Sequence, residues 1–282
     1  MNYPKLKEQL KVAAIHDISC LGRCSLTVAL PVLSAMGIET NVIPTAVLSS
    51  HTGEFTGYTF RDLTEDILPI AEHWRRLNRH YDAIYTGYFG NIKQLEIVEK
   101  VFDILADENT LKFVDPVMAD NGRLYSNFNT AYVNEMKKFC RRADIILPNI
   151  TEACFLTDSQ YVKGPHSEKY ICELLEKLKK LGTAYTVLTG AHTKDGYGAA
   201  WMDNQSGKWN IVLNSYVEGF FYGAGDTLAS VLLGKYLKCG SIEAAAETAV
   251  DFTHKAIINT KQNSRDFRYG LLFEELLGEL IQ

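Results

Sequence analysis

A glycine-rich turn that ends in an aspartate is the strongest chemical signal in the sequence. Gly223-Ala224-Gly225-Asp226 stands directly before an apolar stretch, residues 228–237, that is predicted to be helical. Glycines let the backbone approach a ligand closely, and the free amides and dipole at a helix start attract anions. An aspartate in such a turn can accept the proton of an attacking hydroxyl during phosphoryl transfer. It can also simply cap the helix, and the turn alone leaves this alternative open.

Two acidic motifs follow predicted strands in the middle of the chain. Asp115-Pro116 opens the first, which ends at Asp120, and the second is Asn149-Ile150-Thr151-Glu152. The proline forces Asp115 into an extended conformation at the strand end. Mg²⁺ binds a few carboxylates together with water and phosphate oxygens, so acids from separate strand ends suit it. The alternative is that Asp115 caps a turn and that Thr151 and Glu152 begin a helix.

A third phosphate-binding candidate is the end of the predicted strand 185–189. Thr189-Gly190 forms a small polar turn there, and its hydroxyl and amide could bind phosphate oxygens. An ordinary turn at the end of a strand would look the same. The sequence contains no Walker A motif and no H-R-D or D-F-G tripeptide, which disfavours a P-loop enzyme and a protein kinase.

Candidate substrate-binding residues cluster after the first three predicted strands. They are Asp17 and Ser19 after the first strand, His51 and Thr52 after the second, and Tyr88 after the third. These residue types supply an apolar face and a few fixed polar groups, which a small-molecule site requires. His51 and Tyr88, taken singly, are typical structural residues.

The elements that must position these residues alternate between strands and helices. Strands are predicted at residues 12–16, 40–47, 83–86, 112–115, 145–147 and 185–189, with a hairpin at 198–202 and 208–213. Helices are predicted at residues 25–36, 63–79, 92–105, 130–140, 168–181, 225–237 and 242–259. This alternation predicts an α/β fold with a mostly parallel sheet between helices. Ligands bind beyond the carboxyl ends of such strands, where every candidate residue lies.

Length and composition limit the possible classes of protein. The 282 residues are 46% hydrophobic without a linker or repeat, so we expect one domain spanning residues 1–282. The net charge of −5 is well mixed and gives no support for a nucleic-acid or membrane-surface partner. The polar N-terminus and the absence of a long apolar stretch predict neither a signal peptide nor a spanning helix. The six cysteines form no C-x-x-C pair, as expected of reduced thiols in the cytoplasm.

The motifs together resemble the ribokinase-like superfamily and, within it, the pyridoxal/pyridoxamine kinases. Gly223-Ala224-Gly225-Asp226 resembles the superfamily's C-terminal signature, and the two acidic motifs resemble those of vitamin B6 kinases. Ser49-Ser50-His51-Thr52 and Thr86-Gly87-Tyr88 resemble their substrate segments. Ala119 stands where glycine is usual. In the first loop, His16-Asp17-Ile18-Ser19 replaces the Gln-Ser-His that is usual in vitamin B6 kinases, and this Asp-x-Ser start is closer to that of hydroxymethylpyrimidine kinases. The resemblance spans the chain from the first strand to the helix after Asp226.

The resemblance implies a three-layer α/β/α sandwich and a kinase that uses ATP and Mg²⁺ to phosphorylate the 5′-hydroxymethyl group of a vitamin B6 vitamer. Asp226 would be the base, with Gly223 and Gly225 forming the anion hole. The remaining roles are implied as follows: nucleotide binding by Asn149, Thr189, Gly190 and Ala224; metal binding by Asp115, Asp120 and Glu152; and substrate binding by Asp17, Ser19, His51, Thr52 and Tyr88. Such a vitamer is a flat heteroaromatic alcohol, so its site would need an apolar face and a few fixed polar groups. Either Asp17 or Ser19 could face the ring, and Asp17 would favour a protonated ring nitrogen or an amine. The family also implies a homodimer.

Three other functions stay open on the sequence. A sugar or nucleoside kinase of the same superfamily is disfavoured, because the first 60 residues contain neither a Gly-rich polar sugar pocket nor a larger lid. A hydroxymethylpyrimidine kinase is favoured by Asp17 and Ser19 in the first loop. A ligand-binding protein that lacks catalysis is disfavoured by the presence of a base together with two metal-binding acids, since simple binding requires neither.

Overall fold

In the computed structural model, residues 9–281 are described, so most of the polar N-terminal segment lies outside the described residues. A nine-stranded sheet runs through the molecule in the order β11-β10-β9-β8-β5-β4-β1-β2-β3. The pairs from β2 through β1, β4, β5 and β8 to β9 are parallel, and β3, β10 and β11 are antiparallel to their neighbours. The prediction of a mostly parallel sheet in an α/β fold is confirmed.

The strands have the following bounds: β1 Lys11–Ser19, β2 Glu39–Leu48, β3 Phe60–Asp62, β4 Ala83–Thr86, β5 Leu111–Val114, β8 Ile145–Ile146, β9 Tyr185–Thr193, β10 Gly196–Asp203 and β11 Trp209–Asn214. A separate hairpin is formed by β6, Ala119–Asp120, and β7, Arg123–Leu124. Strand β4 is buried at every position because helices cover both faces of the sheet, which explains its continuous apolar sequence.

The helices are α1 Leu26–Ala35, α2 Thr64–Arg76, α3 Ile92–Leu105, α4 Thr130–Cys140, α5 Ile150–Thr157, α6 Glu168–Leu178, α7 Ala224–Cys239 and α8 Ile242–Asn263. Short 3₁₀ segments lie at Lys179–Leu181, Phe267–Tyr269 and Glu274–Leu280. Asn91, Asn129 and Ser167 cap α3, α4 and α6 through their side chains, which fixes where these helices begin. Among the described residues, no helix has the length and apolar character needed to cross a bilayer.

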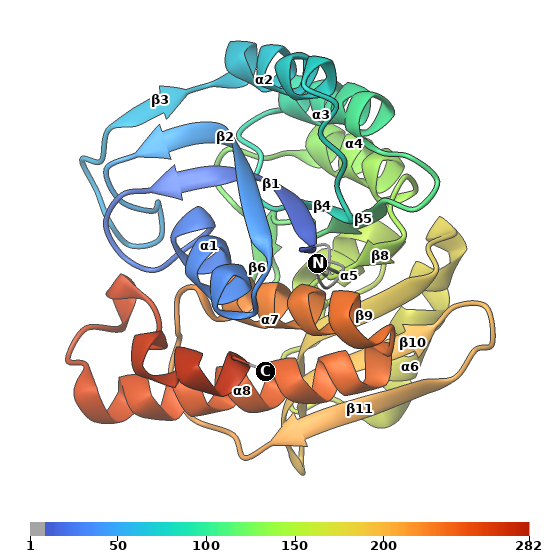
Figure 1. Cartoon of the computed structure of the whole chain (residues 1–282). Helices are drawn as coiled ribbons and strands as arrows, with labels where there is room; N and C mark the ends of the chain where they lie inside the picture. The colour runs from blue at the N-terminus through green and yellow to red at the C-terminus, as the bar shows by residue number, and fades with distance from the viewer. Residues whose placement is uncertain (1–8, 282) are drawn as a thin grey trace, which may run out of the picture.

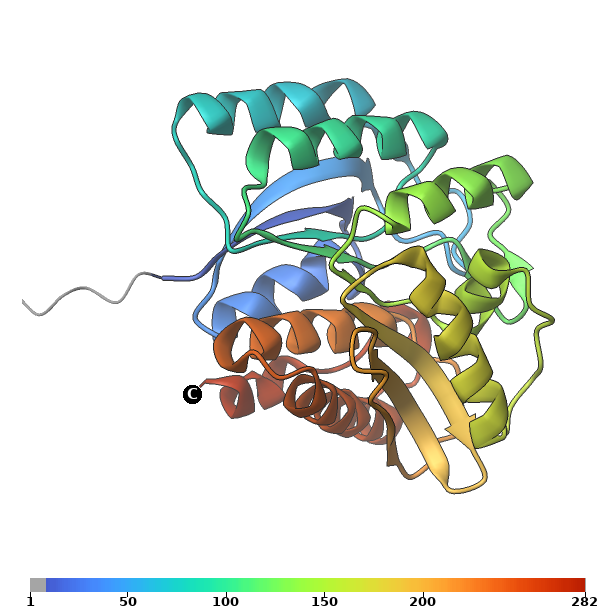
Figure 2. The same ribbon diagram turned by 90° about the vertical axis from the view of Figure 1, so that its right-hand side faces the viewer.

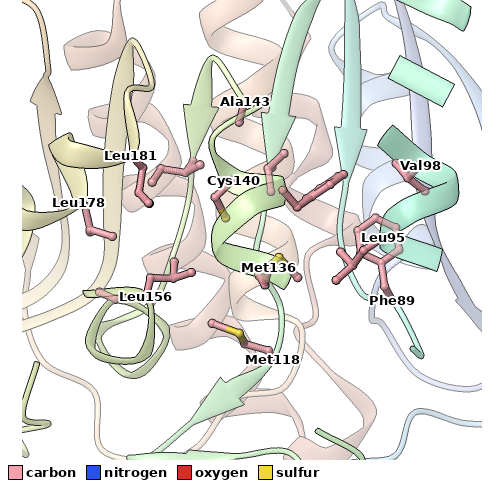
Figure 3. Close-up of a cluster of buried hydrophobic side chains, with 14 of the residues drawn as sticks. Phe89, Leu95, Val98, Met118, Met136, Cys140, Ala143, Leu156, Leu178 and Leu181 are labelled. Atoms are coloured by element: carbon pink, nitrogen blue, oxygen red, sulfur yellow. The ribbon is translucent and has the colours of Figure 1, made fainter. Parts of the chain in front are cut away.

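Helices cover the sheet on both faces, which gives three layers (Figures 1 and 2). Helices α1, α7 and α8 lie on one face and α2 to α6 on the other. Each face has its own apolar core. One core includes Phe89, Met136 and Leu178 beneath the second group of helices, and Figure 3 shows part of it. The other includes Val12, Tyr85 and Leu232, beneath the helices that carry the glycine-rich turn.

Several elements differ from the predictions. Strand β1 continues to Ser19 because it pairs with β2 up to that residue, so Asp17 and Ser19 lie within the strand and not after it. Strand β9 continues to Thr193 instead of ending at Thr189, because the antiparallel partner β10 pairs with its whole length. Strand β3 and the β6–β7 hairpin were not predicted, because each is too short to produce a hydrophobic period in the sequence. Helix α5 is the helix that was the alternative interpretation of Thr151 and Glu152. The predicted hairpin at residues 198–213 is confirmed as β10 and β11.

Candidate active site

The glycine-rich turn forms the start of α7, as the sequence predicts. Gly223 precedes the helix in the left-handed region with a φ of 72°, and a Cβ there would lie 2.2 Å from the carbonyl oxygen of Arg23. Glycine is therefore required at this position. A Cβ at Gly225 would meet nothing within 4 Å, so the space beside this residue is open. The turn and helix start thus offer an anion-binding surface, with Ala224 as the first helical residue.

Asp226 lies in the first turn of α7, where burial raises the pKa of its carboxyl. A hydrogen bond from the Ser25 backbone and one from the Cys24 thiol, at 3.4 Å from Oδ2, oppose that shift of the pKa. Both partners belong to the loop between β1 and α1. A carboxylate at this position can act as a general base toward a group bound at the start of the helix.

Asp17 brings a second carboxylate into electrostatic range of Asp226. Oδ1 accepts a hydrogen bond of 2.6 Å from Ser25, and Oδ2 accepts one of 3.0 Å from Ser19. Burial raises the pKa of Asp17 to about 6, and the charge of Asp226 adds to the increase. Ser19 is fully buried and its hydroxyl points to Asp17. The Ser19 hydroxyl therefore helps to fix the orientation of the Asp17 carboxylate.

Tyr88 and its neighbours line the region next to Asp17. The pKa of Tyr88 is raised by burial and by the nearby charge of Asp17, and its ring packs 5.8 Å from that of Phe128. Gly87, the residue before it, lies against His16, because a Cβ at this glycine would be 2.3 Å from the imidazole Nδ1. The His16 ring is fully buried, and burial lowers its pKa to about 3, so it is neutral.

His51 has both ring nitrogens engaged within the protein. Nδ1 accepts from the Gly53 amide at 3.1 Å, so Nε2 carries the proton and donates to the Arg268 carbonyl at 2.6 Å. The ring stacks on Tyr222 with centroids 4.8 Å apart. His51 thus connects the loop after β2 to the C-terminal segment and to the glycine-rich turn. Thr52, the next residue, is exposed.

Asp115 and Glu152 form a second pair of buried carboxyls. The pKa of Asp115 is raised well above its usual value by burial and then by the charges of Glu152 and Asp226. The pKa of Glu152 is raised by burial to about 8, with a further contribution from Asp120 on the β6–β7 hairpin. Burial also raises the pKa of Asp120. A cation bound here would relieve this mutual repulsion.

The helix start that was the alternative for Thr151 and Glu152 is present in the structure, where Asn149 and Glu152 mark it. They form a capping box: the Asn149 side chain accepts from the Glu152 amide at 2.9 Å, and Glu152 Oε2 accepts from the Asn149 amide at 2.8 Å. Glu152 Oε1 also accepts from the Met118 amide at 3.0 Å, and Asn149 Nδ2 donates to the Ala119 carbonyl. These bonds join α5 to the loop after β5.

No group of three or more His, Cys, Asp or Glu side chains within residues 9–281 is arranged to hold a metal ion by itself. Mg²⁺ usually takes only one or two carboxylates and completes its shell with water and phosphate oxygens. Asp115, within electrostatic range of Glu152, is compatible with that limited role.

Thr189 and Gly190 lie within β9, which corrects the expectation of a turn at the end of the strand. The register of β9 against β10 shifts here, since Ala199 pairs with Thr189 and Gly198 with Ala191. Gly190 is the extra residue of this β-bulge and has a φ of 72°. Bulges redirect the backbone next to functional sites. A bridge between Asn149 and Thr189 places the bulge beside the start of α5.

Cys24, Ser25 and Tyr222 were not predicted as site residues. Cys24 lies 202 positions before Asp226 in the sequence, so no local pattern could reveal their contact. A surface hollow of about 570 Å³ lies elsewhere, between β3 and the starts of α2 to α4; it is lined by residues such as Asp62, Lys93 and Asn129. None of the predicted site residues lines this hollow.

Comparisons with known proteins agree with the fold. The phosphomethylpyrimidine kinase family matches residues 34–268. A Bacteroides thetaiotaomicron protein, provisionally named a phosphomethylpyrimidine kinase and crystallised with pyridoxal, is 36% identical, with a TM-score of 0.91 over 98% of this chain and 96% of that one. Pyridoxal kinase from Lactobacillus plantarum is 30% identical, with a TM-score of 0.88 over 97% of each chain. Pyridoxal kinase from Dictyostelium discoideum is 28% identical over 90% of this chain and 87% of its own.

Proposed function

The chain belongs to the phosphomethylpyrimidine kinase family of the ribokinase-like superfamily, and from that premise we propose that it phosphorylates the 5′-hydroxymethyl group of a vitamin B6 vitamer, using ATP. The observation that carries the proposal is the position of Asp226 at an anion-binding helix start, within electrostatic range of the buried Asp17. The pyridoxal bound by the Bacteroides relative supports the choice of vitamer. The enzyme is thus a phosphotransferase with an alcohol acceptor.

The reaction follows from the geometry of the turn. Asp226 takes the proton of the acceptor hydroxyl as its oxygen attacks the γ-phosphorus in line. The new oxygen–phosphorus bond forms while the bond to the bridging oxygen of ADP breaks, and Asp226 later returns the proton to solvent. Backbone amides around Gly223, Ala224 and Gly225 stabilise the negative charge on the phosphoryl group. Most of the rate enhancement comes from positioning and charge stabilisation.

Mg²⁺ would bind at the second acidic pair. Asp115 would hold the ion, directly or through water, with Glu152 and Asp120 completing the negative surroundings. When bound, the metal neutralises charge on the phosphates and orients them. The capping bonds of Glu152 fix this carboxylate in place, so its cap and its electrostatic role are compatible.

Nucleotide phosphates would lie along the edge formed by the turn before α7, the bulge in β9 and the start of α5. Gly190 exposes backbone at the bulge, and Thr189 next to it offers a hydroxyl. Asn149 holds this edge together through its cap and its bond to Ala119.

Asp17 and Tyr88 would recognise the substrate ring. A carboxylate that is ionised above about pH 6 favours a protonated ring nitrogen or an amine, and the tyrosine supplies an aromatic face. Ser19 orients Asp17, and His51 with Thr52 closes the site from the loop after β2. His51 would act through the order of that loop, because its nitrogens already have partners.

We extend the proposal to the whole chain acting as one kinase domain, as a homodimer in the cytoplasm. The family resemblance supports the dimer. The cysteines of the chain are all free in the structure, which fits a reducing compartment.

Parallel phosphorylation assays test the proposal. Pyridoxal, pyridoxamine, pyridoxine and hydroxymethylpyrimidine are each offered with MgATP, and we expect the highest kcat/KM with a B6 vitamer. A clear preference for the pyrimidine would instead support the alternative that the family name and Asp17-Ile18-Ser19 favour. Binding of these compounds without any turnover would contradict both kinase assignments.

A further inference from the structure

Cys24 belongs to the site, but the reaction above gives it no role. It lies on the loop between β1 and α1, is partly exposed, and is not part of a disulfide. Its sulfur is 3.4 Å from Oδ2 of Asp226, a normal length for a hydrogen bond involving sulfur. A thiol that contacts the base directly can influence the orientation of the Asp226 carboxylate and its pKa.

The direction of this hydrogen bond follows from the surroundings of the thiol. Burial raises the pKa of Cys24 well above its usual value, and the charges of Asp226 and Asp17 raise it further. The thiol therefore stays protonated at neutral pH and donates a hydrogen bond to the carboxylate. These surroundings oppose formation of a thiolate, so Cys24 is not arranged as a nucleophile.

The neighbouring residue gives an independent sign that the loop is built for this contact. Ser25 precedes α1 with a φ of 53° and a ψ of −124°, a conformation that residues other than glycine rarely adopt. Its side chain does not cap the helix. Instead its hydroxyl donates to Asp17 and its backbone bonds to Asp226. Cys24 and Ser25 thus supply donors to both carboxylates from one strained turn.

We propose that Cys24 is a positioning residue for the catalytic base: its thiol donates a hydrogen bond to Asp226, holds the carboxylate in orientation toward the acceptor hydroxyl and favours its ionised form. The inference rests on the proposed phosphotransfer function, because it assigns Cys24 a role through Asp226. It also predicts an effect of Asp226 on the thiol that does not depend on any substrate.

The first test is the pH profile of kcat/KM for Cys24→Ala and Cys24→Ser, measured with whichever alcohol the wild-type enzyme accepts. Removing the donor leaves the burial of Asp226 less opposed, so in Cys24→Ala we expect the acidic limb to move up by about one pH unit. Activity at the foot of that limb then falls about tenfold and largely recovers at higher pH. Cys24→Ser keeps a donor and should restore the wild-type limb. Cys20→Ala, in the same loop but exposed, is the matched control.

The second test uses the rate at which Cys24 is alkylated, followed by peptide mass spectrometry at pH 8. Asp226→Asn removes the charge that opposes thiolate formation, so Cys24 should react several-fold faster in this variant, while Cys20 is unchanged. An unmoved acidic limb in Cys24→Ala, or an unchanged alkylation rate in Asp226→Asn, overturns the inference. If no alcohol is phosphorylated, the proposed function fails, and the alkylation test still decides whether the contact exists. The same holds if Cys24→Ala does not fold.

Discussion

At the scale of single residues, the site is governed by acids that cannot all be ionised at low energetic cost. Burial is the first cause of the raised pKa of Asp17, Asp115, Glu152 and Asp226, and neighbouring charges raise the pKa of the first three further. Perturbed carboxyls of this kind cluster at functional sites. Hydrogen bonds oppose the effect of burial at three of these acids: the loop after β1 donates to Asp17 and Asp226, and backbone amides donate to Glu152.

Replacing the base tests its role most directly. In Asp226→Asn we expect kcat to fall by about 10²–10⁴-fold, the usual contribution of a positioned general base. KM for the alcohol should change little, since the amide has nearly the same shape. Steady-state kinetics with circular dichroism as the folding control measure this. A variant that retains most of its turnover would show that Asp226 is not the base.

The contribution of Asp17 to the free energy of unfolding depends on pH. Its pKa is raised from 3.8 to about 6 in the folded protein, so the folded state binds this proton more tightly than the unfolded state. The contribution of Asp17 to stability is therefore fully present below about pH 4 and is lost as the pH rises through 6. A shift of this size corresponds to about 3 kcal/mol, and the two serine hydrogen bonds, which lower the pKa, are already included in it.

We therefore expect Asp17→Asn to raise the free energy of unfolding at pH 7.5 by about 1–3 kcal/mol and to leave it nearly unchanged at pH 4. Urea denaturation at the two pH values measures the difference. The same variant should raise KM for pyridoxamine about tenfold or more, because the carboxylate that favours a cation is gone. If Asp17→Asn has the same free energy of unfolding as the wild-type protein at both pH values, and the same KM for pyridoxamine, this account of Asp17 is contradicted.

At the scale of elements, the two glycines of the turn before α7 have different tasks, although they look alike in the sequence. Gly223 has a positive φ and no room for a Cβ beside Arg23, whereas Gly225 is helical and open. Gly223→Ala should lower stability by about 1–3 kcal/mol and reduce kcat strongly, because the turn must shift. Gly225→Ala should keep or increase stability, since alanine favours helix by about 0.5–1 kcal/mol.

Thermal unfolding and kinetics of both variants measure this pair, and Gly225→Ala is the control for folding. If both alanines destabilise the protein equally, the strain of the turn does not reside at Gly223.

The elements also show what the sequence could and could not predict. The bounds of α3 and α4 were predicted correctly because Asn91 and Asn129 mark their starts and each helix has one apolar face. Helix α5 could be raised only as an alternative, since its eight residues are mostly buried, which removes the amphipathic pattern. The bulge at Gly190 depends on pairing with β10, so no local signal marks it.

The candidate site divides in the same way. Residues at strand ends, such as Asp17 and Asp115, could be placed from the alternation of strands and helices alone. Contacts between distant segments could not. His51 bonds to Arg268, 217 positions away, and Cys24 to Asp226, 202 positions away. Spacing in the sequence carries no information about such pairs.

At the scale of the whole molecule, the site joins the two ends of the described chain. The loop after β1 receives the C-terminal segment, since the Arg23 amide donates to the Tyr269 carbonyl at 3.0 Å. The loop after β2 is held by the same segment through His51 and through the Arg268 guanidinium, which lies 5.2 Å from the centre of the Phe55 ring. Ligands that bind between these loops should therefore stabilise the fold as a unit.

Thermal shifts with substrates test that coupling. A ligand at 100 times its Kd adds about 2.7 kcal/mol to the free energy of unfolding, which for a chain of this size raises Tm by roughly 5 °C. We expect such a shift with a B6 vitamer and MgATP, and a smaller one with either alone. Asp226→Asn should keep the shift although it has lost turnover, because the base contributes to the transition state more than to binding. A simple sugar alcohol is the control and should have no effect. A shift that vanishes in Asp226→Asn would mean that this carboxylate holds the substrate, and its role as the base would then have to be reassigned.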